Sequence, residues 1–401
     1  MIPASDRMAH VHSDIRGPLY FKALEMQQQG INVLKLNTGN PASFGFTMPD
    51  SVRGALCEGM DGAVAYCDSR GMLRARNSIY AYHRSKGLTG FGLNDIFLTN
   101  GVSEAVEILT QAILNPGDEV LCPSPNYSLW SNCVYLAEAR PVFYRCDEQA
   151  GWNPDLTDIR KKITPRTRAI IIINPNNPTG VLYSKEVLLD LLEIARQNRL
   201  LVFSDEIYDR LVYEPRQHLS CAALAPDLSV ITLNGLSKSH MICGFRCGWC
   251  VLNSPGKELD EIRGAVDRLC SMRLCANALT QLVVPAALED TASTRAQFVP
   301  GGRLYEQRKA VTEALSGVEG ISFVKNDAAF YLFPRLDEKR FHVTDDRELA
   351  MDLLLKKQIL IVPGSGFDYP EPNHFRIVML PDAATLSHAT HEIVDYLNSR
   401  I

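Results

Sequence analysis

The chain is organised around the stretch Asn234-Gly235-Leu236-Ser237-Lys238-Ser239-His240. It follows the apolar run Val230–Leu233, which is typical of a buried strand in a parallel sheet. A lysine just beyond such a strand lies where open α/β sheets bind their ligands, and burial there favours the uncharged amine that can form an imine. Arg246, in Gly244-Phe245-Arg246, can bind a phosphate with both arms of its guanidinium. A lone lysine is more often a solvated surface residue, so the prediction depends on the other strand ends.

Composition indicates a large soluble protein. The 401 residues are enough for a large core and two domains, and 46% hydrophobic with 22% charged residues is an ordinary globular balance. The net charge of −5 has no basic stripe, which argues against a nucleic-acid partner. The sequence shows no signal peptide and no membrane-spanning run, and its eleven scattered cysteines suggest reduced thiols. We therefore predict a cytoplasmic protein without a membrane segment or a metal site.

Four more apolar runs each end in residues that suit a ligand. These runs are expected strands at 95–98, 119–122, 168–173 and 200–203, and they are followed by Gly101, Val102 and Ser103; by Tyr127; by Asn177; and by Asp205 and Tyr208. Each end has a plain structural explanation, such as a helix cap, a packed ring or a turn. Because the carboxyl ends of parallel strands meet at one edge of a sheet, five unusual ends together favour a binding site.

The chemistry of these residues defines the ligand. Glycine and serine at a helix N-terminus, with a nearby arginine, suit a phosphate. Tyr127 suits a planar ring, and a buried Asp205 needs a cation such as a protonated ring nitrogen. Asn177 and Tyr208 can donate hydrogen bonds to a phenolic oxygen, and Lys238 can condense with an aldehyde. Pyridoxal phosphate carries all of these groups.

Several motifs spread over nearly the whole chain also occur together in a known family. They are Ile15-Arg16-Gly17-Pro18, the stretch 36–41 (Leu-Asn-Thr-Gly-Asn-Pro), 66–71 (Tyr-Cys-Asp-Ser-Arg-Gly), 174–180 (Asn-Pro-Asn-Asn-Pro-Thr-Gly), 205–208 (Asp-Glu-Ile-Tyr), 234–238, 244–246 and 301–307 (Gly-Gly-Arg-Leu-Tyr-Glu-Gln). The chain resembles the fold-type I, class I pyridoxal-phosphate aminotransferases, and most closely their alanine (glutamate–pyruvate) transaminase branch. The resemblance implies a large domain with a mostly parallel central sheet, a smaller α+β domain, and a homodimer with shared active sites.

The resemblance also implies a role for each site residue. Lys238 would be the catalytic residue, which binds the cofactor covalently and then moves the proton of the substrate α-carbon. Asp205 would keep the ring nitrogen protonated. The other cofactor contacts would be Gly101, Val102, Ser103, Tyr127, Asn177, Tyr208, Ser237 and Arg246, with Tyr66 from the second subunit. Arg376 would bind the substrate α-carboxylate with help from Gly39 and Asn177, although a salt-bridged arginine is the plainer explanation from its position alone.

Two motifs depart from the family pattern. Many relatives have a phosphate-binding serine three residues before the lysine, where this chain has Gly235, which leaves Ser237 as the candidate. The alanine-transaminase branch usually has an Arg-Gly-Ala-Leu-Tyr run, and this chain has Asp327-Ala328-Ala329-Phe330-Tyr331. A glutamate substrate also needs a cation for its side-chain carboxylate, for which Arg16 and Arg273 are the candidates.

These inferences combine into one prediction with two alternatives. We expect an N-terminal arm with part of the small domain at 1–45, a large domain at 46–295 that includes a long helix over about 277–289, and a small domain at 296–401. The predicted function is a ping-pong amino transfer between an L-amino acid and a 2-oxo acid, with alanine/pyruvate and glutamate/2-oxoglutarate as the expected pairs. The alternatives are a pyridoxal-phosphate enzyme with another substrate, or with an elimination or cyclisation reaction, and a ligand-sensing domain.

Overall fold

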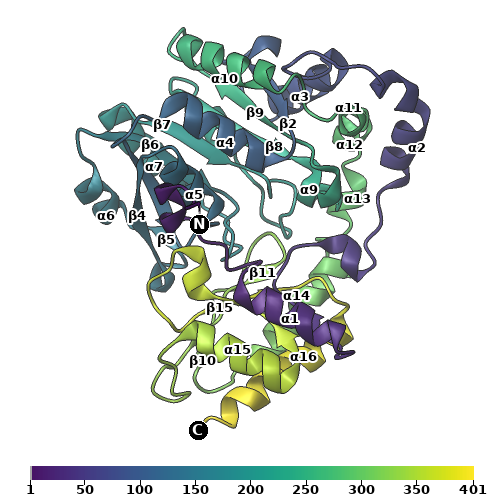
Figure 1. The fold of residues 1–401 in the computed structure, drawn as a ribbon, viewed down its shortest axis with the longest axis vertical. Coiled ribbons are helices and arrows are strands. Elements are labelled where there is room, and N and C mark those ends of the chain that lie inside the picture. The colour runs from purple at the N-terminus through teal and green to yellow at the C-terminus, as the bar shows by residue number, and fades with distance from the viewer. Residues whose placement is uncertain (1) are drawn as a thin grey trace.

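The computed structural model of the protein describes residues 2–401, and an eight-stranded sheet forms the centre of its upper part (Figure 1). In sheet order the strands are β2 (Ile96–Thr99), β9 (Gly248–Asn253), β8 (Val230–Gly235), β7 (Leu201–Asp205), β6 (Thr167–Ile173), β3 (Glu119–Ser124), β4 (Arg140–Asp147) and β5 (Asn153–Pro154). Strands β4, β3, β6, β7 and β8 pair in parallel, whereas β9 runs antiparallel between β8 and β2. The predicted mostly parallel α/β sheet is confirmed, and β2, β3, β6, β7 and β8 all end at the same edge.

Both faces of this sheet are buried, as the isoleucine run of β6 shows. Ile170 and Ile172 belong to the core on one face, and Ile171 and Ile173 belong to the core on the other. The same alternation separates Cys247 from Cys250, the one Cys-x-x-Cys spacing in the chain. Because these two thiols point into opposite cores, they cannot form a disulfide or share a metal ion.

Helices cover the two faces of the sheet. One face packs against α4 (Val102–Ile113), α5 (Leu129–Leu136) and α10 (Asp260–Met272), and the other against α3 (Leu73–Ser85), α7 (Lys185–Asn198), α8 (Cys221–Leu224) and α12 (Val284–Glu289). The remaining helices of this part are α2 (Asp50–Gly59), α6 (Leu156–Lys162), α9 (Leu236–Ser239), α11 (Ala278–Gln281) and α13 (Ala292–Arg295). Short 3-10 turns lie at Asp6–His10, Pro41–Phe44, Met60–Ala63, Leu93–Asp95, Glu148–Ala150, Cys243–Phe245 and Gly364–Phe367.

The lower part of the molecule joins both ends of the chain around a second core. It contains α1 (Pro18–Gln28), α14 (Arg303–Leu315), α15 (Asp346–Lys357) and α16 (Ala383–Asn398) (Figure 1). Its short strands pair as β1 (Leu34–Lys35) with β13 (Ile359–Leu360), β10 (Ile321–Ser322) with β12 (Arg335–Leu336), and β11 (Tyr331–Leu332) with β15 (Phe375–Val378) and β14 (Val362–Pro363). The predicted domain boundaries at residues 45 and 295 stay predictions.

None of the helices in the described part of the chain combines the length and the apolar character that a bilayer crossing needs.

Candidate active site

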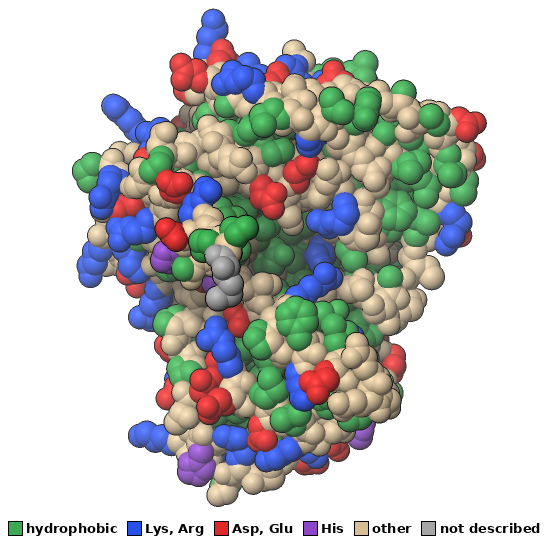
Figure 2. Space-filling view, viewed as in Figure 1, with side chains coloured by type: hydrophobic (Ala, Val, Ile, Leu, Met, Phe, Trp, Pro, Cys, Tyr) green, Lys and Arg blue, Asp and Glu red, His purple; other side chains and the backbone are tan. Residues whose placement is uncertain are grey.

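A cavity of about 660 Å³ lies at the carboxyl ends of the parallel strands. On the face drawn in Figure 2 the molecule is hollowed between its upper and lower parts, with Lys and Arg side chains along the edge. The predicted site residues that line the cavity are Arg16, Gly39, Val102, Ser103, Tyr127, Asn177, Asp205, Tyr208, Ser237, Lys238, Arg246 and Arg376. The fold thus brings together residues from the arm, from five strand ends and from the small sheet.

Lys238 lies on the one-turn helix α9, directly after β8. Its Nζ donates a hydrogen bond to the backbone oxygen of Gly39 at 3.0 Å and lies 5.9 Å from the centre of the Phe330 ring. No carboxylate of residues 2–401 pairs with this amine, which is unusual for a lysine inside a protein. The amine is therefore available to react with a ligand.

Asp205 ends β7 and is buried. Its Oδ2 accepts a hydrogen bond from the Trp130 indole nitrogen at 3.1 Å, and its Oδ1 accepts one from the Ile207 amide at 3.3 Å. Within the described chain no cation pairs with it, and burial raises the pKa of its carboxyl to about 6. A buried carboxylate in this position favours a ligand that brings a positive charge.

The turn from β2 into α4 supplies an anion site. Gly101 has φ 82°, in the left-handed region, and α4 begins at Val102 with free amides and Ser103 in its first turn. A Cβ at residue 101 would collide with the Arg246 guanidinium, so the glycine lets that arginine reach the helix N-terminus. Arg246 itself has φ 55° and uses one amino group to bind the Cys243 oxygen at 3.1 Å. Gly101 therefore shapes the site without lining it.

Gly235, the departure from the family pattern, has a packing reason. A Cβ at this position would lie 2.7 Å from the Cys247 oxygen and 3.0 Å from the Gly248 Cα on the adjacent strand β9. A serine there would require the two strands to move apart. The hydroxyl that lines the cavity on this segment is that of Ser237.

Arg376, in the centre of β15, is buried without an acidic partner among the described residues. Its two amino groups donate to Asn177 Oδ1 at 2.8 Å and to the Asn37 backbone oxygen, while its buried Nε has no hydrogen-bond partner in the described part of the chain. The rings of Tyr331 and Phe367 lie 4.6 and 4.7 Å from its guanidinium carbon. It is therefore not a salt-bridged structural arginine, and it provides a second anion site in the cavity.

Of the two arginines predicted for a side-chain carboxylate, the structure places only Arg16 at the cavity. Arg16 lies on the arm before α1, is exposed, and makes no ion pair with any described residue. Arg273 is turned away, because its Nε lies 3.0 Å from Glu104 and its amino group donates to the Leu98 oxygen at 2.9 Å. Arg273 therefore does not line the cavity of its own chain, and its predicted contact with a substrate carboxylate stays a prediction.

Tyr66 also lies outside the cavity of its own chain. It is 79% exposed and lines a surface hollow with the stretch 275–278. Its predicted contact across a subunit boundary stays a prediction.

The altered run at 327–331 affects the site less than its sequence suggests. Asp327 faces Arg216 at 3.7 Å, away from the cavity, and Ala329 adopts φ 55°. Only Phe330 and Tyr331 approach the reactive groups: the Phe330 ring lies beside Lys238, and the Tyr331 hydroxyl meets that of Tyr208 at 3.0 Å.

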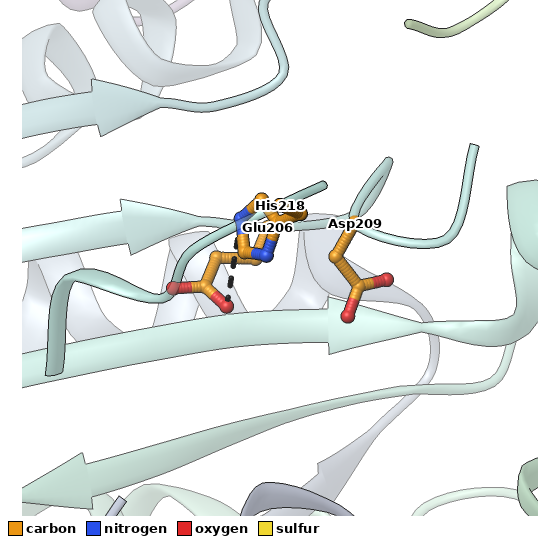
Figure 3. Close-up of side chains that lie close together, drawn as sticks. All are labelled: Glu206, Asp209 and His218. Carbon is orange, nitrogen blue, oxygen red and sulfur yellow. Dashed lines mark ion pairs between the residues drawn. The ribbon is translucent and has the colours of Figure 1, made fainter. Parts of the chain in front are cut away.

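Buried charges anchor the turn that carries Asp205 and Tyr208. Figure 3 shows the side chains of Glu206, Asp209 and His218 together, with potential metal-ligating atoms within 4.8 Å of one another. The Lys86 ammonium lies 2.6 Å from Asp209 and 3.3 Å from Glu206, so the protein itself supplies the positive charge. Burial lowers the pKa of His218 to about 4, and the imidazole is therefore neutral at pH 7. The anchor holds the back of the turn while its front faces the cavity.

Among the residues at the site that were not predicted from the sequence, Trp130, Tyr331 and His12 contact the predicted residues or line the cavity with a charged group. Trp130 lies three residues after Tyr127, and this spacing could have indicated a shared helical face. His12 lines the cavity from the arm and contacts Asp14 at 3.3 Å and Asp368 at 2.9 Å. These two carboxylates, Asp14 first, raise the pKa of His12 to about 9, and no local pattern in the arm signals this contact.

Comparison with known proteins agrees with this geometry. Residues 31–393 match the family model of aminotransferase class I and II. The glutamate-pyruvate aminotransferase AlaA of Escherichia coli K12 is 47% identical over 380 residues, which cover 95% of this chain and 94% of that protein. The alanine aminotransferase of Mycobacterium tuberculosis H37Rv is 41% identical, with 98% of this chain and 92% of that protein covered. The crystal structure of an aminotransferase from Escherichia coli superposes with a TM-score of 0.97 at 46% identity and covers 99% of this chain and 98% of that one.

Proposed function

The chain belongs to the class I and II aminotransferases, and on that premise we propose that it binds pyridoxal 5'-phosphate and exchanges amino groups between alanine/pyruvate and glutamate/2-oxoglutarate. As a member of this family it is an enzyme, a transaminase. The alanine and glutamate pairs are supported by the names of relatives that are 41–47% identical to it.

The cofactor proposal rests on one observation: the same cavity holds a buried Asp205 that pairs with no described cation and a Lys238 that pairs with no described carboxylate. Pyridoxal phosphate fits both, since its ring nitrogen can be protonated and its aldehyde reacts with an amine. Its phosphate suits the free amides of α4 together with Ser103, Ser237 and Arg246.

Bound pyridoxal phosphate supplies an electron-accepting ring for a substrate that has lost its α-proton. The protein supplies the remaining functions. Arg376 binds the α-carboxylate and so fixes the position of the α-carbon, and Lys238 Nζ takes the α-proton and later returns one. Asp205 keeps its negative charge beside the ring nitrogen and thereby holds the proton there.

Arg16 supports glutamate and 2-oxoglutarate as the second substrate pair. An α-amino acid with an apolar side chain needs one carboxylate site, which Arg376 provides, whereas glutamate and 2-oxoglutarate need a second. Arg16 lines the same cavity with no described acid paired to it, so its guanidinium can bind the distal carboxylate with two hydrogen bonds.

An apolar surface supports a homodimer. Exposed side chains gather around the end of α10 and the stretch after α2, and we call them the apolar patch: Val64 (87% exposed), Tyr66 (79%), Met272 (80%), Leu274 (52%) and Leu279 (41%). Apolar side chains exposed in this number are typical of an interface between subunits. We propose that a second copy of the chain covers the patch, and that the reduced thiols indicated by eleven unpaired cysteines belong to a cytoplasmic protein.

The test is an absorbance titration of the purified protein with alanine and, separately, with glutamate. We expect a visible band from lysine-bound cofactor in the wild type, its loss on addition of either amino acid, and recovery on addition of pyruvate or 2-oxoglutarate. Lys238→Ala should lower turnover by at least about 1,000-fold. A band that responds to neither amino acid would refute the substrate proposal, and ammonia release without an added 2-oxo acid would indicate an elimination instead.

A further inference from the structure

Tyr331 contacts cavity residues from both the upper and the lower part of the molecule. It lies on β11 of the lower part, is 2% exposed, and packs edge-on against Tyr208 of the upper part with ring centres 5.6 Å apart. A Cβ at Gly39 would lie 2.6 Å from the Tyr331 hydroxyl and 3.3 Å from Lys238 Nζ, so that hydroxyl and the reactive amine approach the same point. The side chain is therefore central to the site, although it came from a run that looked like a departure from the family.

Among residues 2–401 the hydroxyl of Tyr331 has one hydrogen-bond partner, the hydroxyl of Tyr208 at 3.0 Å. If Tyr208 donates its own proton to a ligand oxygen in the cavity, its oxygen can only accept, and Tyr331 must then be the donor. Burial, then the neighbouring Tyr331, raises the pKa of Tyr208 well above the usual range, so the hydroxyl stays protonated at neutral pH and can donate. In a buried chain each hydrogen bond strengthens the next.

The ring of Tyr331 serves the other end of the cavity. The centre of this ring lies 4.6 Å from the guanidinium carbon of Arg376, which is the residue proposed to bind the substrate carboxylate. Contact with an aromatic face orients an arginine and partly compensates its buried charge. One side chain thus touches both the group that donates to the cofactor and the group that binds the substrate.

We infer that Tyr331 is a positioning residue, whose hydroxyl strengthens the hydrogen bond from Tyr208 to the phenolic oxygen of the cofactor while its ring holds Arg376 for the substrate carboxylate. The inference rests on the proposed function. A donor to the phenolic oxygen stabilises its negative charge, so the cofactor bound at Lys238 loses its proton at lower pH. The hydroxyl and the ring can be removed separately.

The experiment is a pH titration of the visible absorbance of the holoenzyme, with KM for alanine measured on the same variants. Tyr331→Phe removes the hydroxyl and keeps the ring, so the midpoint should rise by about 0.5 pH unit with KM changed less than about twofold. Tyr331→Leu removes both, so the same midpoint shift should come with a KM about fivefold higher. Tyr208→Phe should shift the midpoint further, and adding Tyr331→Phe to it should change nothing more.

The matched control is Tyr213→Phe. Tyr213 is also a buried tyrosine with an arginine, Arg308, 3.7 Å from its ring centre, and its hydroxyl binds the Leu304 oxygen outside the cavity. Its midpoint should equal that of the wild type. A wild-type midpoint in Tyr331→Phe, or an additive double variant, would overturn the inference and leave the proposed function standing. A wild type without the visible band would overturn both.

Discussion

At the scale of single residues, the carboxylate of Asp205 is a buried acid with which no described cation pairs. Its neighbours are an indole and an amide, which donate hydrogen bonds but bring no positive charge. Burial therefore raises its pKa to about 6. The same property that makes the residue costly in the cofactor-free protein makes it a strong partner for a cationic ring nitrogen.

Asp205 should give the cofactor-free protein a stability that falls as pH rises. The folded protein keeps this proton up to about pH 6, whereas the unfolded chain releases it near pH 3.8, the ordinary pKa of an aspartate. The folded state therefore binds more protons than the unfolded chain between these two pH values. The resulting loss in the free energy of unfolding is about 3 kcal/mol and is fully present above pH 6. Urea unfolding at pH 4 to 8 measures the free energy of unfolding of Asp205→Asn and of the wild type. The difference between them should shift in favour of Asp205→Asn as pH rises. A difference that stays constant with pH would contradict this.

Arg16 should determine the response to dicarboxylates and spare alanine. Removing a charged double hydrogen bond weakens binding by about 10- to 100-fold, so Arg16→Met should raise KM for 2-oxoglutarate and glutamate by that factor. KM for alanine should change less than about twofold. Steady-state kinetics with both pairs measure this, with Arg53→Met as the control on a surface arginine far from the cavity. Equal losses for both pairs would assign Arg16 to the α-carboxylate.

The sequence predicted the residues that strand order alone brings together. Lys238, Asp205 and Asn177 follow buried strands of one parallel sheet, so their meeting needs only that rule. Tyr331 and His12 come from a short strand and an irregular arm, and their positions depend on how the two parts of the chain pack. Arg273 looked equally suitable to Arg16 because its ion pair with Glu104 is a tertiary contact.

At the scale of structural elements, the turn between β2 and α4 combines a strained backbone with a close contact. Gly101 and Gly117 both have a positive φ, of 82° and 84°. A Cβ at Gly101 would collide with Arg246, whereas a Cβ at Gly117 would meet no atom within 4 Å. Replacing Gly117 by alanine therefore tests the free-energy cost of a positive φ alone, whereas replacing Gly101 adds the cost of displacing Arg246.

Gly101→Ala should weaken binding of pyridoxal phosphate by about tenfold or more, because a displaced Arg246 loses its place at the helix N-terminus. Gly117→Ala should lose a similar free energy of unfolding, about 1 kcal/mol, and keep the affinity of the wild type. Cofactor titration of the cofactor-free proteins and urea unfolding provide the two readouts. Equal affinities in the two variants would show that Arg246 does not bind the phosphate.

Element boundaries were harder to predict where side chains keep an apolar pattern through a break. The helix expected over about 277–289 is two helices, α11 and α12, and Pro285 lies in the first turn of α12. Proline has no amide hydrogen to bond the preceding turn, so the helix starts again instead of continuing. The helix α12 packs Val284, Ala287 and Leu288 on the core of the large sheet, whereas α11 buries only Thr280 and Gln281 and leaves Leu279 exposed, so the apolar pattern of the sequence does not reveal the break.

At the scale of the whole molecule, the apolar patch predicts how the chain assembles. Placing a charge in a buried interface is costly, so Met272→Asp should convert a dimer into monomers. The control is Leu355→Asp, which also replaces an exposed apolar side chain by a charge but lies on α15, outside the apolar patch, and should leave the dimer intact. Sedimentation equilibrium measures the mass of each variant. Activity should fall when the dimer is lost if Tyr66 completes the site of the other subunit. A wild type that sediments as a monomer would exclude the assembly.

Arg16 lies on an arm that precedes α1, whereas Asp205 ends a strand of the large sheet and Lys238 lies on the short helix that directly follows another of its strands. If Arg16 binds the distal carboxylate and Lys238 and Asp205 act as we propose, reactivity and side-chain selectivity are encoded in different segments of the gene. Recombination at the border of the arm would give the same reaction a new preference without disturbing the scaffold that performs it. An evolving lineage could in this way change the amino acid it consumes by altering one short segment of the chain.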